Sequence, residues 1–151
     1  MSNFGYEYIL DCVQCDNSKI IDLDNIKEFV KDLIKNTDLN ELGNIKYEYV
    51  DEETAEKAGK PYITGYSIYQ LIITSSIVIH FCDGSNTLYF NLFSCKAFDK
   101  RTVKGLLLKY FNGRVTNESY VTRGWFNLIN HLLYHSKLFW ICGMYFVYAP
   151  V

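Results

Sequence analysis

The sequence predicts an α+β fold in which helices cover one face of an antiparallel β-sheet. Three observations predict it: short β-branched and aromatic segments recur along the chain, segments with helical spacing lie between them, and neighbouring strand segments are separated by short turns. The 13 Tyr and 10 Phe indicate that the second face of this sheet is aromatic and apolar. Because such a face normally finds a partner, we expect the chain to form a homodimer.

The first 60 residues predict two strands and a helix. Residues 4–13 mix aromatic and β-branched residues, which is typical of a strand, and turn residues follow them. Asp24 is the expected N-cap of a helix that ends near Asn36. The apolar residues at helical spacing in this helix are Ile26, Phe29, Val30, Leu33 and Ile34. Residues 45–50 alternate as a second strand, and the charged residues 51–60 predict a mobile loop.

The middle of the chain predicts three consecutive strands. Residues 67–74 and 75–83 are apolar, β-branched runs that meet without a Gly or Pro between them. Residues 83–86, Asp-Gly-Ser-Asn, are typical of a hairpin turn, and residues 87–94 form the returning strand. A junction of two strands without turn residues indicates backbone strain at Thr74–Ser75.

The last third of the chain predicts two helices and two strands. Asp99 caps a helix that Asn112-Gly113 closes, and residues 114–122 alternate as a strand. The apolar face of that helix consists of Val103, Leu106, Leu107, Tyr110 and Phe111. Residues 126–134 and 138–148 predict a short helix and a final strand.

Composition and charge exclude several classes of protein. A length of 151 residues with 49% hydrophobic and 21% charged residues fits one folded domain and excludes intrinsic disorder. The net charge of −2 argues against a dedicated nucleic-acid binder, which usually carries a basic face. Residues 138–151 are apolar, but these 14 residues are too few to span a bilayer, so no membrane partner is expected. Five cysteines, an odd number, and an N-terminus without a signal peptide indicate free thiols in a reducing, cytoplasmic compartment.

Two motifs could carry chemistry but favour structural roles. Cys12 and Cys15 form a Cys-x-x-Cys pair at a strand end, yet no second pair stands at a spacing that completes a zinc site. His131 and His135 lie four residues apart on one helix face, but no Glu follows the first His, as a zincin motif requires. We therefore expect structural thiols, surface or half-buried histidines, and no metal site.

A third group of residues surrounds the strand junction. Ser75 begins one strand, His80 lies further along it, Ser67 precedes both and Cys95 follows on the next strand. Such residues can converge on one site when their strands are neighbours. Composition alone nevertheless favours structural serines and a histidine that is satisfied by hydrogen bonds in the core.

The spacing of these four residues resembles that of the small, prokaryotic-type S-adenosylmethionine decarboxylases. Eight residues separate Ser67 from Ser75, five more lead to His80, and fifteen more lead to Cys95. Residues 93–99, Phe-Ser-Cys-Lys-Ala-Phe-Asp, are similar to the strand that carries the family's catalytic Cys. The four polar residues in register make this resemblance fairly specific.

The resemblance also implies an architecture. It extends from residues 8–11, Tyr-Ile-Leu-Asp, to residues 122–125, Thr-Arg-Gly-Trp. Residues 1–125 are therefore expected to form a decarboxylase-like domain, and residues 126–151 a helix and strand extension of the same domain. The family implies a four-stranded sheet with two helices in each half, paired into an αββα sandwich with sites near the dimer interface.

The resemblance implies a proenzyme that makes its own cofactor. The Ser75 hydroxyl attacks the Thr74 carbonyl, and cleavage between the two leaves a pyruvoyl group derived from Ser75. By the same resemblance Ser67 steadies the tetrahedral intermediate, and His80 removes the Cα proton of Ser75. The pyruvoyl ketone forms a Schiff base with S-adenosylmethionine, and Cys95 returns a proton to the substrate carbon. The decarboxylated product supplies polyamine synthesis, including that of spermidine.

Several positions depart from the family pattern. Thr74 stands where most members have Glu, as it does in some phage-encoded relatives, and Ser76 stands where a His is usual. Residues 81–84, Phe-Cys-Asp-Gly, replace a Trp-Pro-Glu segment that helps to hold the nucleoside. Asp83, one residue earlier than that Glu, can substitute for it only if the turn is rearranged.

The candidate substrate-binding residues are Ile77, Asp83, Tyr62 and Tyr66. The two tyrosines either stack on an adenine ring or belong to the sheet core. The departures leave two alternatives open. One is a pyruvoyl decarboxylase of a basic amino acid such as arginine or ornithine, and the other is a non-processing homologue that binds a ligand or partner and regulates it.

Overall fold

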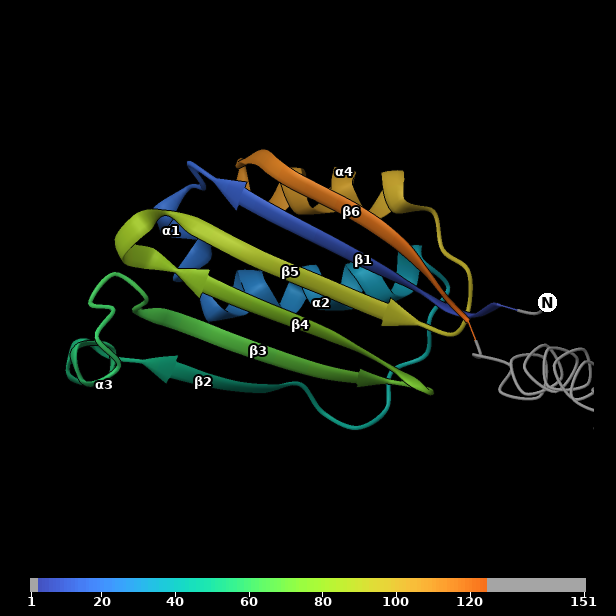
Figure 1. The fold of residues 1–151 in the computed structure, drawn as a ribbon, viewed down its shortest axis with the longest axis horizontal. Helices are drawn as coiled ribbons and strands as arrows, with labels where there is room; N and C mark the ends of the chain where they lie inside the picture. The colour runs from blue at the N-terminus through green and yellow to red at the C-terminus, as the bar shows by residue number, and fades with distance from the viewer. Residues whose placement is uncertain (1–2, 125–151) are drawn as a thin grey trace, which may run out of the picture. The chain divides into compact units, whose positions relative to one another are not determined.

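Six strands form one sheet in the order β2-β3-β4-β5-β1-β6 in the computed structural model, which describes residues 3–124 (Figure 1). The strands are β1 (Asn3–Val13), β2 (Lys46–Val50), β3 (Gly65–Ile72), β4 (Ser75–Cys82), β5 (Thr87–Ser94) and β6 (Arg114–Gly124). The pairs β1–β5, β2–β3, β3–β4 and β4–β5 are antiparallel. The antiparallel sheet is confirmed, but the four strands implied by the resemblance are wrong, because β2 and β6 lie at the two edges of a six-stranded sheet.

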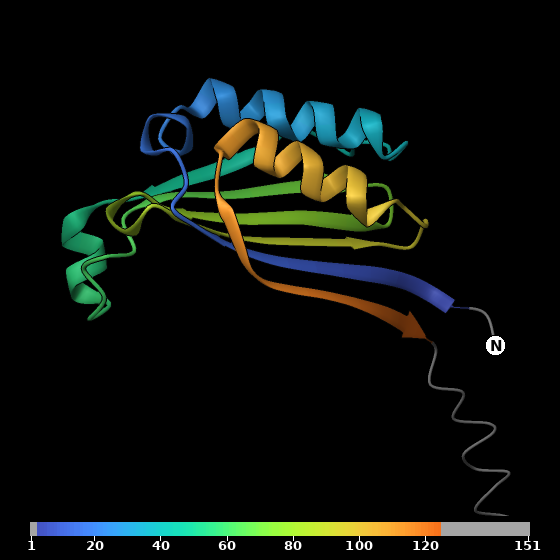
Figure 2. The ribbon, with the colours of Figure 1, turned by 90° about the horizontal axis from the view of Figure 1, so that it is seen from above.

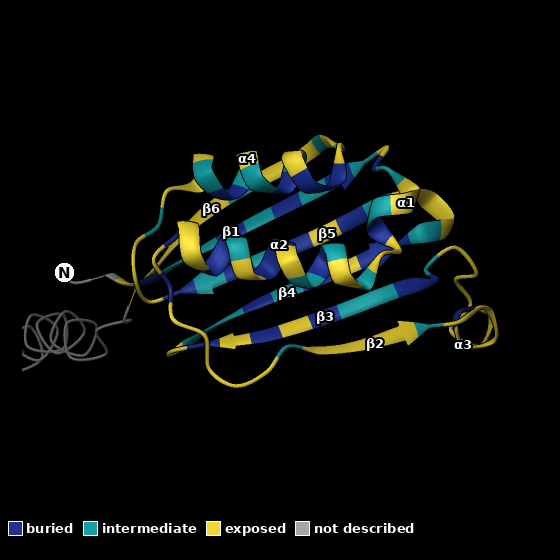
Figure 3. Cartoon of the chain, turned by 180° about the vertical axis from the view of Figure 1, so that it is seen from behind, coloured by how far each residue is buried: buried dark blue, intermediate teal, exposed yellow. Residues whose placement is uncertain are grey.

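Helices α2 and α4 cover one face of this sheet, as predicted (Figure 2). The helices are α1 (Asn17–Ile20), α2 (Leu23–Asn36), α3 (Glu52–Lys57) and α4 (Lys100–Phe111), and the 3-10 turn η1 spans Asp83–Ser85. The buried positions of α2 and α4 face the strands (Figure 3). There, Phe29 of α2 meets Phe90 of β5 and Phe111 of α4 edge-on. Alternate residues of β4 complete this core; they are Ile77, Ile79 and Phe81.

The opposite face of the sheet carries no helix within residues 3–124, and we call it the open face. Along each strand, every second side chain points to the core under the helices, and the side chains between them lie on the open face. Exposed apolar ones are Tyr69, Leu71 and Tyr89. The open face also bears polar groups, including His80 and Asn91. It is therefore partly aromatic and apolar, as predicted, but with polar residues interspersed.

Local hydrogen bonds correct two predictions. The N-cap of α2 is Asp22 and not Asp24, because the Asp22 carboxylate accepts hydrogen bonds from the backbone N–H groups of Asp24 and Asn25. The predicted loop at residues 51–60 contains helix α3, whose first turn is capped in the same way by Asp51. The caps of α4 are as predicted, with Asp99 at its start and Asn112 at its end.

Several predictions fall on residues that the structure does not describe. They are the helix at 126–134, the strand at 138–148, and the residues His131, His135 and Cys142. No helix within residues 3–124 is long and apolar enough to cross a membrane. The expected boundary between residues 1–125 and 126–151 stays a prediction.

Candidate active site

Thr74, Ser75 and Cys95 meet where the β3–β4 hairpin turns. Ile72 and Ser75 are paired across the two strands, so that only Ile73 and Thr74 connect them. Cys95 follows the last residue of β5, the strand next to β4. The Thr74 Oγ1 and Cys95 Sγ atoms lie 2.6 Å apart, and the backbone N–H of Cys95 donates a hydrogen bond of 2.9 Å to Ser75 Oγ. The sequence-predicted nucleophile and acid are therefore in contact.

The backbone at Thr74 is strained, as the sequence predicted. Its φ angle is 61°, in the left-handed region that a β-branched residue rarely adopts. The Thr74 hydroxyl donates a hydrogen bond of 2.8 Å to the carbonyl of Ile73, next to it in the turn. Strain of this kind persists only where the surrounding structure holds it, and it concentrates at functional sites. The peptide bond predicted to be cleaved is thus the one that follows the strained residue.

Cys95 differs from the other cysteines that the structure describes. It is exposed, and its hydrogen bond with Thr74 lowers the pKa of the thiol below the ordinary value. Burial raises the pKa of Cys12 to about 12 and that of Cys15 to about 11. Burial also raises the pKa of Cys82. Among residues 3–124, Cys95 is therefore the exposed thiol with a lowered pKa, whereas Cys12 and Cys15 are free and buried.

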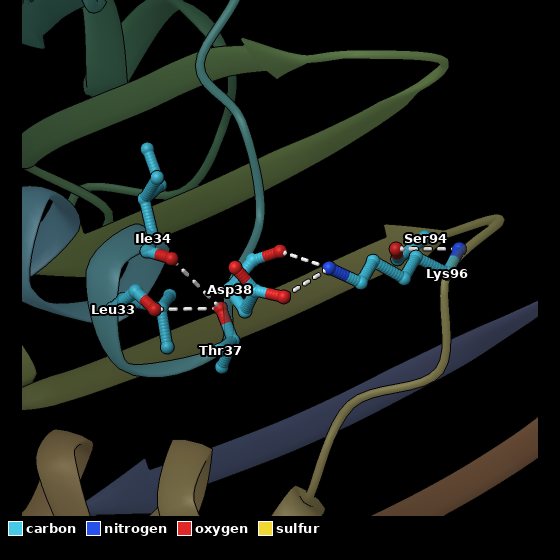
Figure 4. A network of polar contacts seen from close by, with 6 residues as sticks. All are labelled: Leu33, Ile34, Thr37, Asp38, Ser94 and Lys96. Carbon is cyan, nitrogen blue, oxygen red and sulfur yellow. Dashed lines mark hydrogen bonds and ion pairs between the residues drawn. The ribbon is translucent and has the colours of Figure 1, made fainter.

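Two features that the sequence analysis missed hold the segment of Cys95 in place. A Cβ atom at Gly5 would lie 2.6 Å from the Ser94 carbonyl oxygen and 3.1 Å from the Cys95 Cα, so β1 approaches this segment as only glycine allows. Lys96 reaches across to Asp38 after helix α2, where its ammonium donates to the backbone carbonyl at 2.6 Å and to the carboxylate (Figure 4). A glycine inside a strand pattern is a signal of close approach, whereas nothing in the sequence pairs Lys96 with Asp38.

Ser67 and His80 form a second polar pair. They face each other across β3 and β4, and Ser67 Oγ lies 2.9 Å from Nδ1 of His80. His80 is exposed on the open face. The hydroxyl therefore fixes the orientation of the imidazole and leaves Nε2 as the ring nitrogen for proton transfer. Such a pair has the chemistry that proton abstraction requires.

The two polar groups lie at opposite ends of β4. His80 is five residues beyond Ser75, and at the usual rise of a strand this corresponds to about 16 Å. The structure thus brings Ser75 together with Cys95 and brings Ser67 together with His80, but it does not bring the two pairs together within one chain.

The candidate substrate-binding residues occupy three different environments. The side chain of Ile77 is fully buried beneath the helices, which leaves only its backbone for a ligand. Tyr66 packs against the core on the helix side and meets Tyr49 edge-on, whereas Tyr62 is 58% exposed. The Asp83 carboxylate accepts hydrogen bonds from Thr64 and, at 2.8 Å, from Tyr49, whose pKa this contact raises.

A shallow pocket of about 390 Å³ lies beside Asp83, and Asn17, Glu52 and Gly84 help to line it. It is near the His80 end of β4, because Asp83 directly follows that strand. No group of three or more His, Cys, Asp or Glu side chains that could hold a metal ion occurs within residues 3–124.

Comparisons with known proteins identify the family. The family model described as S-adenosylmethionine decarboxylase matches residues 6–124, more than half of the chain. The chain belongs to the S-adenosylmethionine decarboxylase family. The crystal structure of the adenosylmethionine decarboxylase from Aquifex aeolicus VF5 is similar to it, with a TM-score of 0.65 and 16% sequence identity over 82% of this chain and 93% of that chain. No curated protein sequence matches this chain.

These comparisons confirm the resemblance that the spacing of four polar residues predicted. The similarity to the Aquifex aeolicus structure extends through most of the chain and confirms the fold of an S-adenosylmethionine decarboxylase. The family model ends at residue 124, one residue before the expected end of the decarboxylase-like domain. The roles of Ser67, Ser75, His80 and Cys95 stay predictions.

Proposed function

We propose that this chain is a self-processing, pyruvoyl-dependent decarboxylase of S-adenosylmethionine that supplies polyamine synthesis. The observation that carries the proposal is the cluster at the β3–β4 turn, where a strained Thr74 precedes a serine hydroxyl that the Cys95 N–H holds at 2.9 Å. Backbone strain before a serine and a hydrogen bond that orients its hydroxyl both favour attack of that hydroxyl on the preceding carbonyl, the first step towards a pyruvoyl group. The residues present therefore fit the formation of this group.

Cleavage follows from these residues in balanced steps. Ser75 Oγ adds to the carbonyl carbon of Thr74, and the peptide nitrogen leaves as the free amine of Ser75, which converts the peptide bond to an ester. Removal of the Ser75 Cα proton then breaks the Cβ–O bond and releases the Thr74 carboxylate. The enamine that remains at residue 75 takes up water and loses ammonia to give the pyruvoyl group.

Cys95 has a further role in the proposed decarboxylation. The pyruvoyl group supplies a ketone that binds a substrate amine and accepts the electron pair released when carbon dioxide leaves. The Cys95 thiol lies beside Ser75 and is exposed, so it can deliver a proton to the substrate carbon.

A homodimer explains how His80 can act on Ser75. The open face, with its exposed Tyr69, Leu71 and Tyr89, supports a face-to-face pairing of two sheets. A two-fold axis between the sheets and perpendicular to the strands would set the His80 end of one β4 opposite the Ser75 end of the other. Packed sheets lie about 10 Å apart, so side chains from both reach a shared site.

Two further observations concern the compartment and the substrate. All four described cysteines are unpaired, which supports the expected reducing, cytoplasmic compartment.

A second candidate function, decarboxylation of a basic amino acid, is favoured by one observation: each oxygen of the Asp83 carboxylate already accepts a hydrogen bond, one from Thr64 and one from Tyr49, which leaves it fewer acceptor sites for a ribose.

The test of self-processing is the intact mass of freshly purified, denatured protein, with Ser75→Ala as the control. Fragments 1–74 and 75–151, the second with a blocked N-terminus, are the expected products, and the control stays at full length. Wild-type protein that remains uncut over days would instead support the non-processing, regulatory homologue. Carbon dioxide release from S-adenosylmethionine, arginine and ornithine then decides the substrate, and faster release from either amino acid would overturn the proposed one.

A further inference from the structure

Thr74 has a second role besides providing the carbonyl at the cleavage site. We infer that Thr74 is a positioning residue whose hydroxyl holds the Cys95 sulfur in the uncleaved chain, and that cleavage releases the sulfur from this contact. The inference rests on the proposed self-cleavage at Thr74–Ser75. It assigns a function to the residue that stands where most family members have Glu.

The contact is built from one hydroxyl with two neighbours. Thr74 Oγ1 lies 2.6 Å from Cys95 Sγ and 2.8 Å from the Ile73 carbonyl oxygen. A hydroxyl has only one proton to donate. When Cys95 is protonated, its S–H donates to Thr74, which donates to Ile73. When Cys95 is ionised, the hydroxyl turns and donates to the sulfur. Thr74 thus serves both forms of Cys95 but favours the thiolate, because a charged acceptor binds a donor more strongly.

The strained backbone makes this contact dependent on an intact chain. Thr74 is held at a φ of 61° by the two-residue connection between Ile72 and Ser75. Breaking the bond between Thr74 and Ser75 makes Thr74 a chain end, attached through Ile73 alone. A β-branched residue then returns to negative φ, which moves its hydroxyl away from Cys95.

Release changes the acidity of Cys95 in the direction that catalysis needs. The hydrogen bond from Thr74 is the main cause that lowers the pKa of Cys95 in the intact chain. After cleavage Thr74 ends in a carboxylate, whose negative charge disfavours a neighbouring thiolate. Both effects raise the pKa of Cys95 and keep the thiol protonated. A residue that must deliver a proton to the substrate therefore holds that proton more firmly in the cleaved protein than in the intact chain.

The experiment measures the rate of alkylation of Cys95 by iodoacetamide against pH, read by mass spectrometry of the peptide that contains it. The intact state is represented by the full chain with Ser75→Ala, which cannot cleave. Thr74→Val and Thr74→Ser are each added to this variant; valine keeps the shape of threonine, and serine keeps its hydroxyl. The fourth sample is wild-type protein after cleavage, which also lacks the Ser75 hydroxyl.

In the uncleavable chain we expect Thr74→Val to shift the alkylation profile to higher pH and to slow alkylation below its midpoint by about threefold, as loss of one hydrogen bond predicts. Thr74→Ser keeps the original profile, and the cleaved wild-type protein resembles the Thr74→Val variant. An unchanged profile in the Thr74→Val variant overturns the holding role and leaves the proposed function intact. If the wild-type protein never cleaves, both the proposed function and the proposed release of Cys95 are overturned. The variants of the uncleavable chain still measure the hydrogen bond between Thr74 and Cys95.

Discussion

Ser75 and His80 lie on the same strand but five residues apart, which sets their Cα atoms about 16 Å apart. An imidazole must come within hydrogen-bond reach of the proton that it removes. His80 is also tied to Ser67 at 2.9 Å, which directs it across the sheet and not along it. On this geometry the His80 of the same chain is out of reach of the Ser75 Cα proton, so the proposed mechanism requires the His80 of a second chain.

Mixed subunits test this arrangement. We expect His80→Ala and Ser75→Ala proteins to remain uncut when each is purified alone. When the two are unfolded, mixed and refolded together, the His80→Ala chain, which retains Ser75, is expected to be cleaved with the His80 of its partner. The measurement is the intact mass of both chains, which differ enough in mass to be separated.

The controls for this experiment use the same protocol. A mixture of His80→Ala with itself, refolded in parallel, has to stay uncut. Ser67→Ala should behave like His80→Ala, because it removes the hydroxyl that orients the imidazole. If the His80→Ala chain stays intact in the mixed sample while the refolded wild-type protein is cleaved, the site does not combine residues of two chains.

Replacing Cys95 should separate cleavage from decarboxylation. The contact of Cys95 with Ser75 comes from its backbone N–H, which Cys95→Ala retains. We therefore expect Cys95→Ala to cleave fully but to release carbon dioxide from S-adenosylmethionine about 100-fold more slowly, the effect typical of a lost general acid. Intact mass and carbon dioxide release report the two steps. A variant that cleaves and decarboxylates at wild-type rates would remove Cys95 from the mechanism.

The sequence predicted the features that depend on neighbouring residues. The strand boundaries around residues 67–94 follow from runs of β-branched residues, and the short connection at Ile73–Thr74 sets the register that places Ser67 opposite His80. Strain at Thr74 was predicted because no Gly or Pro stands at the junction. Helix α3 was missed because its charged residues lack an apolar face, and only its Asp51 cap marks its start.

Features that depend on distant segments could not be predicted. The clamp of Lys96 on Asp38 joins residues 58 positions apart, and no local pattern encodes it. The close approach of β1 at Gly5 depends on the pairing of β1 with β5, which lies more than 80 residues further along the chain.

Gly5 is expected to be essential for stability. Gly5→Ala places a Cβ 2.6 Å from a backbone oxygen of Ser94, and backbone cannot move aside cheaply, so we expect unfolding to become easier by about 1–3 kcal/mol. Gly105→Ala is the matched control, because nothing lies within 4 Å of a Cβ at this position of α4. It should stabilise the chain by up to about 1 kcal/mol. Urea denaturation compares the two, and a Gly5→Ala protein as stable as wild type would contradict the close approach.

Glu118 should make stability depend on acid pH. Its carboxylate accepts hydrogen bonds from Lys104 at 2.6 Å and from the buried Tyr8 at 2.9 Å, and both lower its pKa below the ordinary value of 4.5. Because the folded pKa is lowered, the contribution of Glu118 is complete above pH 4.5 and is lost as the pH falls through the folded pKa. Urea midpoints of wild type and Glu118→Gln at neutral and acid pH measure this. The difference between the two proteins should shrink in acid, and a difference that is constant with pH would assign the effect of Glu118 to packing alone.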